Sequence, residues 1–374
     1  DDHDFTDFYY SQGKFDLQYL LTWGNTWAEY GGDQAIADWD NFYNTVYGSN
    51  LNNAANYQNL TDQFDISSLA DYVITNSFTV CSDWLNYNTG WWRGLNPEGG
   101  HRKWGYILWD NDATFGHYIN YTGIPDTTPY AEPCDVETLV EPWPDINGHM
   151  RLLTKLRLNP EFDQYYVTRQ ADLMSTVFSC ENMLNYLDSI VNTIGPEMPR
   201  HIQRWGGSMQ EWEQNVDKLR DFITIRCNEL PDGLAGCYDL TGPYPTVLLV
   251  EPPGAGAMQV NTLQYNQFPA ATQFFGGVAL KLIAQPNAAD GYVFDKWEAQ
   301  NNTFVTPNSA TTFMVQGAPD TIVAKFKLAS SPVQEPGTQV FPSVTAFPSV
   351  FKNALTVQYD LPEKAVVQLE IYAM

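Results

Sequence analysis

The stretch CSDWLNYNTGWWRGLNPEGGHRKWGYILWDNDATFG, residues 81–116, carries the pattern that decides how the first part of the chain is organised. It holds eight aromatic residues, five of them Trp, and three Asp. Trp91–Arg93 and Lys103–Trp109 are typical of strands, and the turn-forming residues Asn96–Gly100 lie between them. The sequence therefore predicts a β-hairpin that delivers two closely spaced carboxylates at the end of its second strand.

The polar residues around this hairpin are those that phosphoryl transfer needs. Asp83 is followed five residues later by Asn88, and protein kinases use the same Asp-to-Asn offset in their catalytic loop. Asp110 and Asp112 precede Phe115-Gly116, where a kinase carries a metal-binding Asp before Phe-Gly. Mg²⁺ prefers oxygen ligands, and the acceptor hydroxyl needs a positioned base. The order of these residues favours phosphoryl transfer.

Other uses of the same carboxylates stay open at the level of sequence. An EF-hand is excluded, because Phe115 occupies the position that needs Gly and Tyr121 stands where Glu closes that loop. A D-x-D pair also serves metal-dependent nucleotide-sugar transferases. A structural Ca²⁺ site, or a turn with solvated carboxylates, is the structural alternative.

Amphipathic patterns predict that residues 1–240 are mostly helical. Helices are expected within residues 65–85, 181–194 and 208–230, and Asp65 or Ser67 can cap the first of them. A further helical segment, residues 150–178, is expected to break at Asn159-Pro160.

Composition limits the class of protein. The 374 residues carry a formal net charge of −25, which repels a phosphate backbone and disfavours nucleic-acid binding. The sequence contains no run of about 18 apolar residues, so no transmembrane segment is expected. The first residues lack the basic and apolar regions of a signal peptide, so we expect that an export signal was removed or that a longer protein begins upstream.

The five Cys show no metal-ligand spacing. Cys227 and Cys237 flank Pro231-Asp232-Gly233, and a small disulfide loop between them is one expectation from this spacing. The odd count leaves at least one thiol unpaired or bonded outside the chain. Cys81, two residues before Asp83, is expected to be a buried, small apolar residue.

Residues 10–230 resemble the CotH-type spore-coat kinases, an atypical branch of the protein-kinase-like fold. The resemblance is carried by motifs in matching order: Asp83-Trp84 with Asn86 and Asn88, Lys103-Trp104, Trp109–Asp112, Phe115-Gly116, Leu156, Arg169, Ile194–Met198, His201, Arg204-Trp205 and Arg226. It implies that Asp83 is the base, that Asn86 and Asn88 bind the cofactor, and that Asp110, Asp112 and Asn88 hold the metal. The implied cofactors are ATP and Mg²⁺ (or Mn²⁺).

One departure from the family pattern concerns the nucleotide-binding lobe. Family members carry an upstream lobe with a phosphate-pairing Lys, whereas Lys14 is the only Lys before Asp83 and no Gly-rich loop accompanies it. Residues 1–240 are therefore expected to be the C-terminal portion of the domain. Because positioning supplies much of the acceleration of phosphoryl transfer, this chain alone is expected to transfer little phosphate.

The chain changes character after Tyr238, where β-branched runs with frequent Gly and Pro replace the helical patterns. Residues 247–328 are predicted to form a small all-β module, within which Ala279–Pro286, Gly291–Trp297 and Thr321–Phe326 resemble the divergent internalin-type bacterial repeat. Tyr292, Phe294 and Trp297 are expected to form its core rather than a binding face.

Residues 329–340 have the composition of a linker, and residues 341–374 resemble the start of the C-terminal sorting domain of type IX secretion substrates. The segments that carry this resemblance are Phe347–Phe351, Leu355–Pro362 and the apparent strand that ends at Tyr372. The resemblance implies export through the type IX secretion machinery.

These observations predict a multidomain protein: a mainly helical kinase-like C-lobe with a β-hairpin at the site, followed by small all-β modules. The expected function is Mg-ATP-dependent phosphorylation of Ser or Thr on a surface or secreted protein. The alternative is a non-catalytic cell-surface adhesion or scaffold protein with a kinase-like domain. The expected location is secreted or at the bacterial cell surface, with a protein substrate or surface partner.

Overall fold

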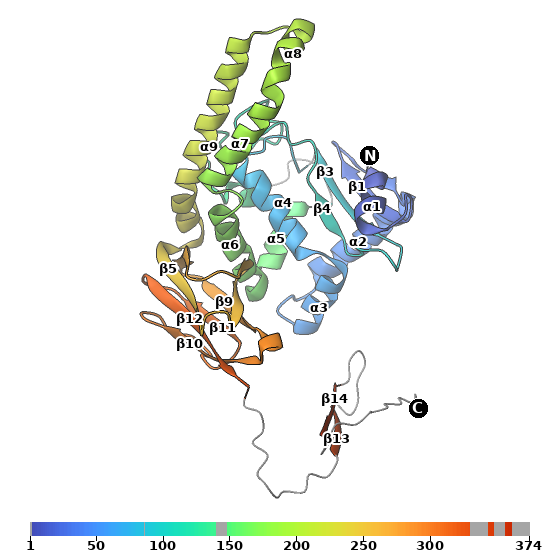
Figure 1. Ribbon diagram of the computed structural model, residues 1–374. Coiled ribbons are helices and arrows are strands. Elements are labelled where there is room, and N and C mark those ends of the chain that lie inside the picture. The colour runs from blue at the N-terminus through green and yellow to red at the C-terminus, as the bar shows by residue number, and fades with distance from the viewer. Residues whose placement is uncertain (1, 86, 140–147, 330–342, 348–355, 361–374) are drawn as a thin grey trace, which may run out of the picture. The chain divides into compact units, whose positions relative to one another are not determined.

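The computed structural model describes the chain except for residues 1, 86, 140–147, 330–342, 348–355 and 361–374. The chain divides into two compact units, residues 1–327 and 328–374. The first unit consists of a helical part with a small sheet, followed by a β-sandwich (Figure 1). The multidomain, helical-then-β character expected from the sequence is confirmed, whereas the assignment as a kinase C-lobe stays a prediction.

The helical part contains nine described α-helices and two short 3₁₀ segments. In chain order they are α1 (Asp2–Tyr10), α2 (Gly32–Gly48), α3 (Ala54–Gln63), α4 (Ile66–Phe78), η1 (Asp135–Thr138), α5 (His149–Arg157), α6 (Pro160–Ser175), α7 (Cys180–Ile194), η2 (Gly195–Glu197), α8 (Met198–Trp205) and α9 (Met209–Tyr238).

Two predicted helix boundaries follow from capping side chains. Asp65 accepts hydrogen bonds from the first backbone N–H groups of α4, as the sequence indicated. Asn159 caps α6 in the same way, and Pro160 stands at the first helical position, where its missing N–H costs nothing. The predicted break between α5 and α6 is therefore confirmed.

A four-stranded antiparallel sheet in the order β2-β1-β3-β4 carries the predicted hairpin. The hairpin consists of β3 (Thr89–Gly94) and β4 (Gly105–Ile107), as predicted, although β4 is shorter than the apolar run suggested. The strands β1 (Leu17–Thr22) and β2 (Thr26–Tyr30) were not predicted. The strand β1 is buried along its whole length, so it lacks the alternation that marks a half-exposed strand.

The aromatic residues of the opening stretch build the main core. Trp39 of α2 lies with its ring centroid 5.4 Å from that of Trp91 and 5.4 Å from that of Trp104, and all three are fully buried. Trp92 is buried on the opposite face of β3. Both Trp91 and Trp92 are therefore core residues, and neither offers an exposed ring on which a ligand could stack.

The helices α7 and α9 run side by side, and α8 lies at the end of this pair (Figure 1). The helix α9 spans 30 residues and continues through Pro231, where the sequence suggested a turn. The neighbouring side chains Leu230 and Leu234 lie in the main core, so tertiary packing compensates for the hydrogen bond that Pro231 cannot donate.

The expected disulfide between Cys227 and Cys237 is wrong. Both residues lie in α9, and ten helical residues separate two Cα atoms by about 15 Å, far beyond the reach of a disulfide. Cys134 pairs instead with Cys237, and Cys180 of α7 pairs with Cys227. Cys81 is free and buried, as expected. The two disulfides thus anchor α9 on both sides of Pro231.

Arg226 connects α9 to the end of α4. Its side chain is 1% exposed and donates to the carbonyl oxygens of Phe78 at 3.1 Å and Ser77 at 2.9 Å. It also donates to the carbonyl of Ala131 and contacts that of Pro129. Burial lowers the pKa of its guanidinium to about 10, so the group remains charged at neutral pH. Arg226 thereby fixes the point at which the chain leaves α4.

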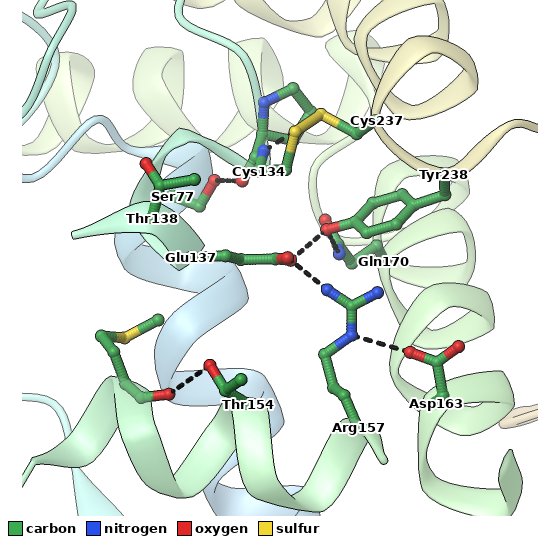
Figure 2. Close-up of polar contacts among 12 residues, drawn as sticks. Ser77, Cys134, Glu137, Thr138, Thr154, Arg157, Asp163, Gln170, Cys237 and Tyr238 are labelled. Carbon is green, nitrogen blue, oxygen red and sulfur yellow. Dashed lines mark hydrogen bonds and ion pairs between the residues drawn. A yellow bond between two sulfur atoms is a disulfide. The ribbon is translucent and has the colours of Figure 1, made fainter. Parts of the chain in front are cut away.

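A second polar cluster, largely half-buried, joins η1, α5, α6 and α9 (Figure 2). The carboxylate of Glu137 accepts hydrogen bonds from Arg157 and from the hydroxyl of Tyr238. Arg157 also pairs with Asp163 at 2.7 Å, and Gln170 donates to the Tyr238 hydroxyl. Burial raises the pKa of Glu137, and Arg157 opposes that shift. Because its members pair with one another, the cluster stabilises the fold rather than forming an open site.

The β part is a sandwich of two four-stranded sheets, ordered β10-β12-β5-β8 and β11-β9-β6-β7. Its strands are β5 (Thr241–Glu251), β6 (Gly256–Val260), β7 (Leu263–Tyr265), β8 (Ala270–Gly276), β9 (Ala279–Pro286), β10 (Tyr292–Ala299), β11 (Thr311–Val315) and β12 (Asp320–Leu328), with the 3₁₀ segment η3 (Ala288–Asp290) before β10. Trp297 is 2% exposed, and Tyr292 and Phe294 pack against the same core. The prediction that these aromatics are core is confirmed.

The sandwich is built directly onto the helical part. Only Asp239 and Leu240 separate α9 from β5, and Leu240 and Phe275 belong to the main core of the helical part. Thr262 donates from its backbone N and its hydroxyl to Asp172 of α6, at 2.8 and 2.6 Å. The two parts therefore share both apolar and polar contacts.

The second unit contains one described hairpin, in which β13 (Ser343–Phe347) pairs antiparallel with β14 (Thr356–Asp360). Most of the predicted linker and of the predicted sorting domain lies outside the described residues. None of the helices in the described part of the chain has the length and apolar character needed to cross a membrane.

Candidate functional site

Two loops bring the predicted site residues together. The first site loop, residues 79–88, follows α4, and the second site loop, residues 108–122, follows β4. Their backbones are joined by hydrogen bonds from Ser82 N to Ala113 O at 2.9 Å and from Phe115 N to Thr79 O at 2.7 Å. Further along both loops, the hydroxyl of Thr122 accepts a hydrogen bond from Trp84 N at 2.9 Å and donates one to Trp84 O. The two loops thus form one connected structure.

The D-x-D segment alternates between the interior and the surface. The side chain of Asn111 points inward, where its amide donates to Asn76 Oδ1 at 3.2 Å and contacts Cys81 Sγ at 3.9 Å. Asp110 and Asp112, on either side of it, are exposed. Asn111 therefore fixes the segment to α4 and the first site loop while both carboxylates face solvent. No role for Asn111 follows from the sequence pattern alone.

Asp83 and Asn88 contact each other across the first site loop. The Asn88 amide donates to Asp83 Oδ2 at 3.0 Å, and Asn88 is 7% exposed. The pKa of Asp83 is raised, first by partial burial and then by the negative charges of Asp110 and Asp112, while the Asn88 hydrogen bond opposes the shift. Asp83 directly follows Ser82 and Asp112 directly precedes Ala113, so the hydrogen bond from Ser82 N to Ala113 O brings Asp83, Asp112 and the neighbouring Asp110 into one acidic group.

Cationic side chains of the described residues do not neutralise the acidic group. Within the described part of the chain, no Lys, Arg or His forms an ion pair with Asp83, Asp110 or Asp112; the paired arginines lie elsewhere, for example Arg93 with Asp38. Lys14, the only Lys upstream of the site, pairs with Asp4 at 2.9 Å. A concentration of unpaired negative charge favours a cation or a positively charged group at this position.

The described residues do not contain a ready-made metal cage. No set of three or more His, Cys, Asp and Glu side chains among them is arranged to hold a metal ion. Asn86, which the sequence analysis assigned to cofactor binding, lies outside the described residues. The donors that the structure offers are the carboxylates of Asp110 and Asp112 and the side chain of Asn88.

Backbone strain is concentrated in the two site loops. Ten described non-glycine residues have a positive φ, and six of them lie in these loops: Val80, Leu85, Asn88, Asp110, Phe115 and Tyr118. A positive φ is uncommon for bulky residues, and such strain persists where the surrounding structure enforces it, often at functional sites. In this protein the hydrogen bonds between the loops and the buried Trp84 provide that enforcement.

Comparison with known proteins gives two matches. Residues 8–230 match the CotH kinase protein family, which is more than half of the chain. The chain belongs to the CotH kinase protein family. Residues 266–330 of this CotH-family chain match the divergent InlB B-repeat domain. No curated protein matches the chain.

The match also corrects one expectation. The matched span of this CotH-family chain, residues 8–230, is not restricted to a C-terminal portion of the family domain, as the isolated Lys14 had suggested. Both site loops lie within that span. The first match ends at residue 230 and the second at residue 330, and the resemblance of residues 341–374 to a type IX sorting domain stays a prediction.

Proposed function

We propose that this CotH-family protein is a secreted protein kinase that transfers phosphate from Mg-ATP to Ser or Thr of a surface or secreted protein. The observation that carries the proposal is the acidic group formed by Asp83, Asp110 and Asp112 next to Asn88. An ordinary surface turn would not need two strained loops joined by backbone hydrogen bonds to hold its carboxylates together.

In this proposal each group has a separate role. Asp83, which is partly buried and held by Asn88, accepts the proton of the acceptor hydroxyl. Its raised pKa brings the carboxylate closer to the working range of a general base. Asp110 and Asp112 are exposed, carry no ion pair among the described residues and offer the oxygen ligands that a divalent cation prefers.

The donor set fits Mg²⁺ in a kinase-like site. Mg²⁺ retains several waters and is held by one or two carboxylates together with substrate phosphates, so a three-carboxylate cage is not required. Asp110, Asp112 and Asn88 would hold it, and the ion would neutralise phosphate charge. Asn86 is retained as a proposed cofactor ligand because of the family resemblance.

The proposal of export rests on the disulfides. Two disulfides within one unit are typical of proteins that fold in an oxidising compartment and are rare in the cytosol of mesophiles. A CotH-family domain followed by a B-repeat also fits a protein of the bacterial surface. Export through the type IX secretion machinery is proposed from the resemblance of residues 341–374.

The cation site can be tested with Mn²⁺ as a paramagnetic replacement for Mg²⁺. We expect Mn²⁺ to broaden the NMR signals of residues 83, 88, 110 and 112 first, and ATP to strengthen the effect. The double variant Asp110→Asn, Asp112→Asn should abolish it, whereas Asp62→Asn on the exposed face of α3 should leave it unchanged. Broadening that survives the double variant would contradict the proposed ligands.

Phosphate transfer is tested separately with labelled ATP and casein as a generic acceptor, using the longest natural form of the protein. Asp83→Asn should lower the rate by a factor of about 100 or more, since a general base contributes about 10²–10⁴-fold. Asp62→Asn serves as the control. An Asp83→Asn variant that keeps the full rate would exclude Asp83 as the base.

A second candidate is a non-catalytic surface adhesion or scaffold protein. The absence of a metal-holding group of three or more His, Cys, Asp and Glu side chains, within the residues described, is the observation that favours it. Cation binding without any transfer to casein, peptide or the chain itself would support this candidate over the kinase.

A further inference from the structure

A cleft lies where the sandwich meets the helical part. None of the described residues proposed for the kinase function lines it. Its volume is about 340 Å³, within the range of about 300–1,000 Å³ that ligand pockets occupy. Ligand sites occur preferentially at such junctions between domains. The residues that line this junction cleft are Tyr57, Ile66, Glu161, Gln164, Tyr165, Thr168, Gln259, Asn261, Thr262, Lys281 and Ile283.

One wall of the junction cleft is the outer face of a sandwich sheet. Gln259 of β6 stands opposite Ile283 of β9 in the strand register. Their strand neighbours Val260 and Leu282 point to the opposite face, where they are fully buried in the sandwich core. The other wall comes from α3 and α6, which contribute Tyr57 and Tyr165 among others. The lining residues of the sheet can therefore be changed without disturbing the sandwich core.

The walls of the junction cleft are fixed relative to each other. Arg169 of α6 binds Asp71 through two hydrogen bonds of 2.7 and 2.9 Å and donates to the Thr262 hydroxyl at 2.9 Å. Asp172 accepts two further hydrogen bonds from Thr262, and Gln164 donates to Ala279 O at 2.7 Å. A preformed cleft loses little conformational entropy when a ligand binds.

The lining residues determine the chemistry of a ligand. Two aromatic rings and two Ile side chains provide apolar surface, whereas amides and hydroxyls provide hydrogen-bond donors and acceptors. Burial raises the pKa of both Tyr57 and Tyr165 to about 12, so both phenols are neutral donors at physiological pH. Glu161 and Lys281 contribute one charge of each sign. The junction cleft is thus amphipathic, and the two charges that line it cancel.

These properties exclude two ligand classes. A phosphorylated ligand would meet one Lys and one Glu on a chain with a net charge of −25. A lipid chain needs a continuous apolar lining, whereas the apolar surface of Ile66 and Ile283 is interrupted by amides, phenol hydroxyls and two charged side chains. We propose that the junction cleft binds a neutral saccharide of one or two residues, whose apolar ring face packs on the tyrosines and whose hydroxyls bond to the amides and hydroxyls of the walls.

The test uses the full chain with the neutral disaccharides cellobiose and N,N′-diacetylchitobiose as probes, measured by saturation-transfer NMR and titration calorimetry. We expect at least one probe to bind. Ile283→Trp, which fills the cleft, and Gln259→Leu, which removes an amide, should each weaken binding by about tenfold or more, the effect of losing one good contact. Val315→Trp provides a matched control, because Val315 is exposed on β11 of the same sheet and does not line the cleft.

The outcomes separate clearly. Thermal unfolding of each variant shows whether the fold is intact. Binding that is weakened by Ile283→Trp and Gln259→Leu, but not by Val315→Trp, supports the junction cleft. The inference is overturned if neither disaccharide binds at millimolar concentration, if both cleft variants bind as well as the parent chain, or if Val315→Trp weakens binding equally. None of these outcomes depends on kinase activity.

Discussion

The contact made by Arg226 gives a sharp prediction about stability. The substitution Arg226→Met keeps much of the side-chain volume but removes the guanidinium. The carbonyls of Ser77, Phe78 and Ala131 then lose the donor that they bind in the buried interior. Hydrogen bonds from a charged donor contribute about 1.5–3 kcal/mol each, so three of them amount to roughly 5–9 kcal/mol.

Part of this loss is offset. Burying the charge of Arg226 costs several kcal/mol in the parent chain, and the variant no longer has that cost. We therefore expect the free energy of unfolding to fall by about 3–5 kcal/mol, similar to the cost of breaking a buried pair. Urea unfolding followed by tryptophan fluorescence measures the change. Arg220→Ala is the control on the same helix. Arg220 pairs with Asp188, and both side chains are more than one-third exposed. Loss of this ion pair should therefore lower the free energy of unfolding by less than about 1 kcal/mol.

The substitution Arg226→Met should also affect the candidate functional site. Ser77 and Phe78 end α4 immediately before the first site loop, so Arg226→Met should shift the NMR signals of that loop even in the folded variant. Arg220→Ala should leave those signals unchanged. A free energy loss below 1 kcal/mol for Arg226→Met, or a loss equal to that of Arg220→Ala, would refute the view that Arg226 fixes the end of α4.

Three further predictions concern disulfides and carboxyl groups. Removing the Cys134–Cys237 disulfide should cost about 4–5 kcal/mol of unfolding free energy, because it closes a loop of 103 residues; peptide mapping that finds Cys227 joined to Cys237 would contradict the pairing. The pKa of Asp172 is raised from 3.8 to about 6, mainly by burial, so the folded chain holds this proton while the unfolded chain releases it; stability should fall by about 3 kcal/mol in all between about pH 3 and 7, and Asp172→Asn should remove that part of the pH profile in thermal melts. Asp110→Asn should lower the pKa of Asp83 measured by carboxyl NMR titration, and an unchanged pKa would show that the two carboxylates do not interact.

The sequence predicted the parts of the fold that have strong local signals. Asp65 caps α4 as its side chain indicated, and the helices α5 and α6 are separated at Asn159-Pro160 as predicted. The β3–β4 hairpin was predicted because Pro97 and Gly99 lie in a turn between apolar runs. The strand β1 was missed because both of its faces are buried and it therefore lacks alternation. The wrong disulfide arose at Pro231, where local turn propensity was overridden by the packing of Leu230 and Leu234.

For the candidate site, the sequence identified the functional residues but not the contacts that hold them in place. The spacing of Asp83, Asn88, Asp110 and Asp112 was visible, and the structure brings these side chains into one group. The inward turn of Asn111 could not be predicted, since it depends on Asn76 and Cys81, which are more than 29 residues away in the chain. Contacts at such separations leave no local pattern in the sequence.

The direct passage from α9 into β5 has a practical consequence for how this protein can be divided. A chain cut after Tyr238 would lose Leu240 and Phe275 from the main core and would leave Asp172 without Thr262. The sandwich is therefore an integral part of the first compact unit rather than an exchangeable spacer. Recombination or truncation at this boundary should yield aggregating fragments, whereas a cut after residue 327 should leave the first compact unit intact.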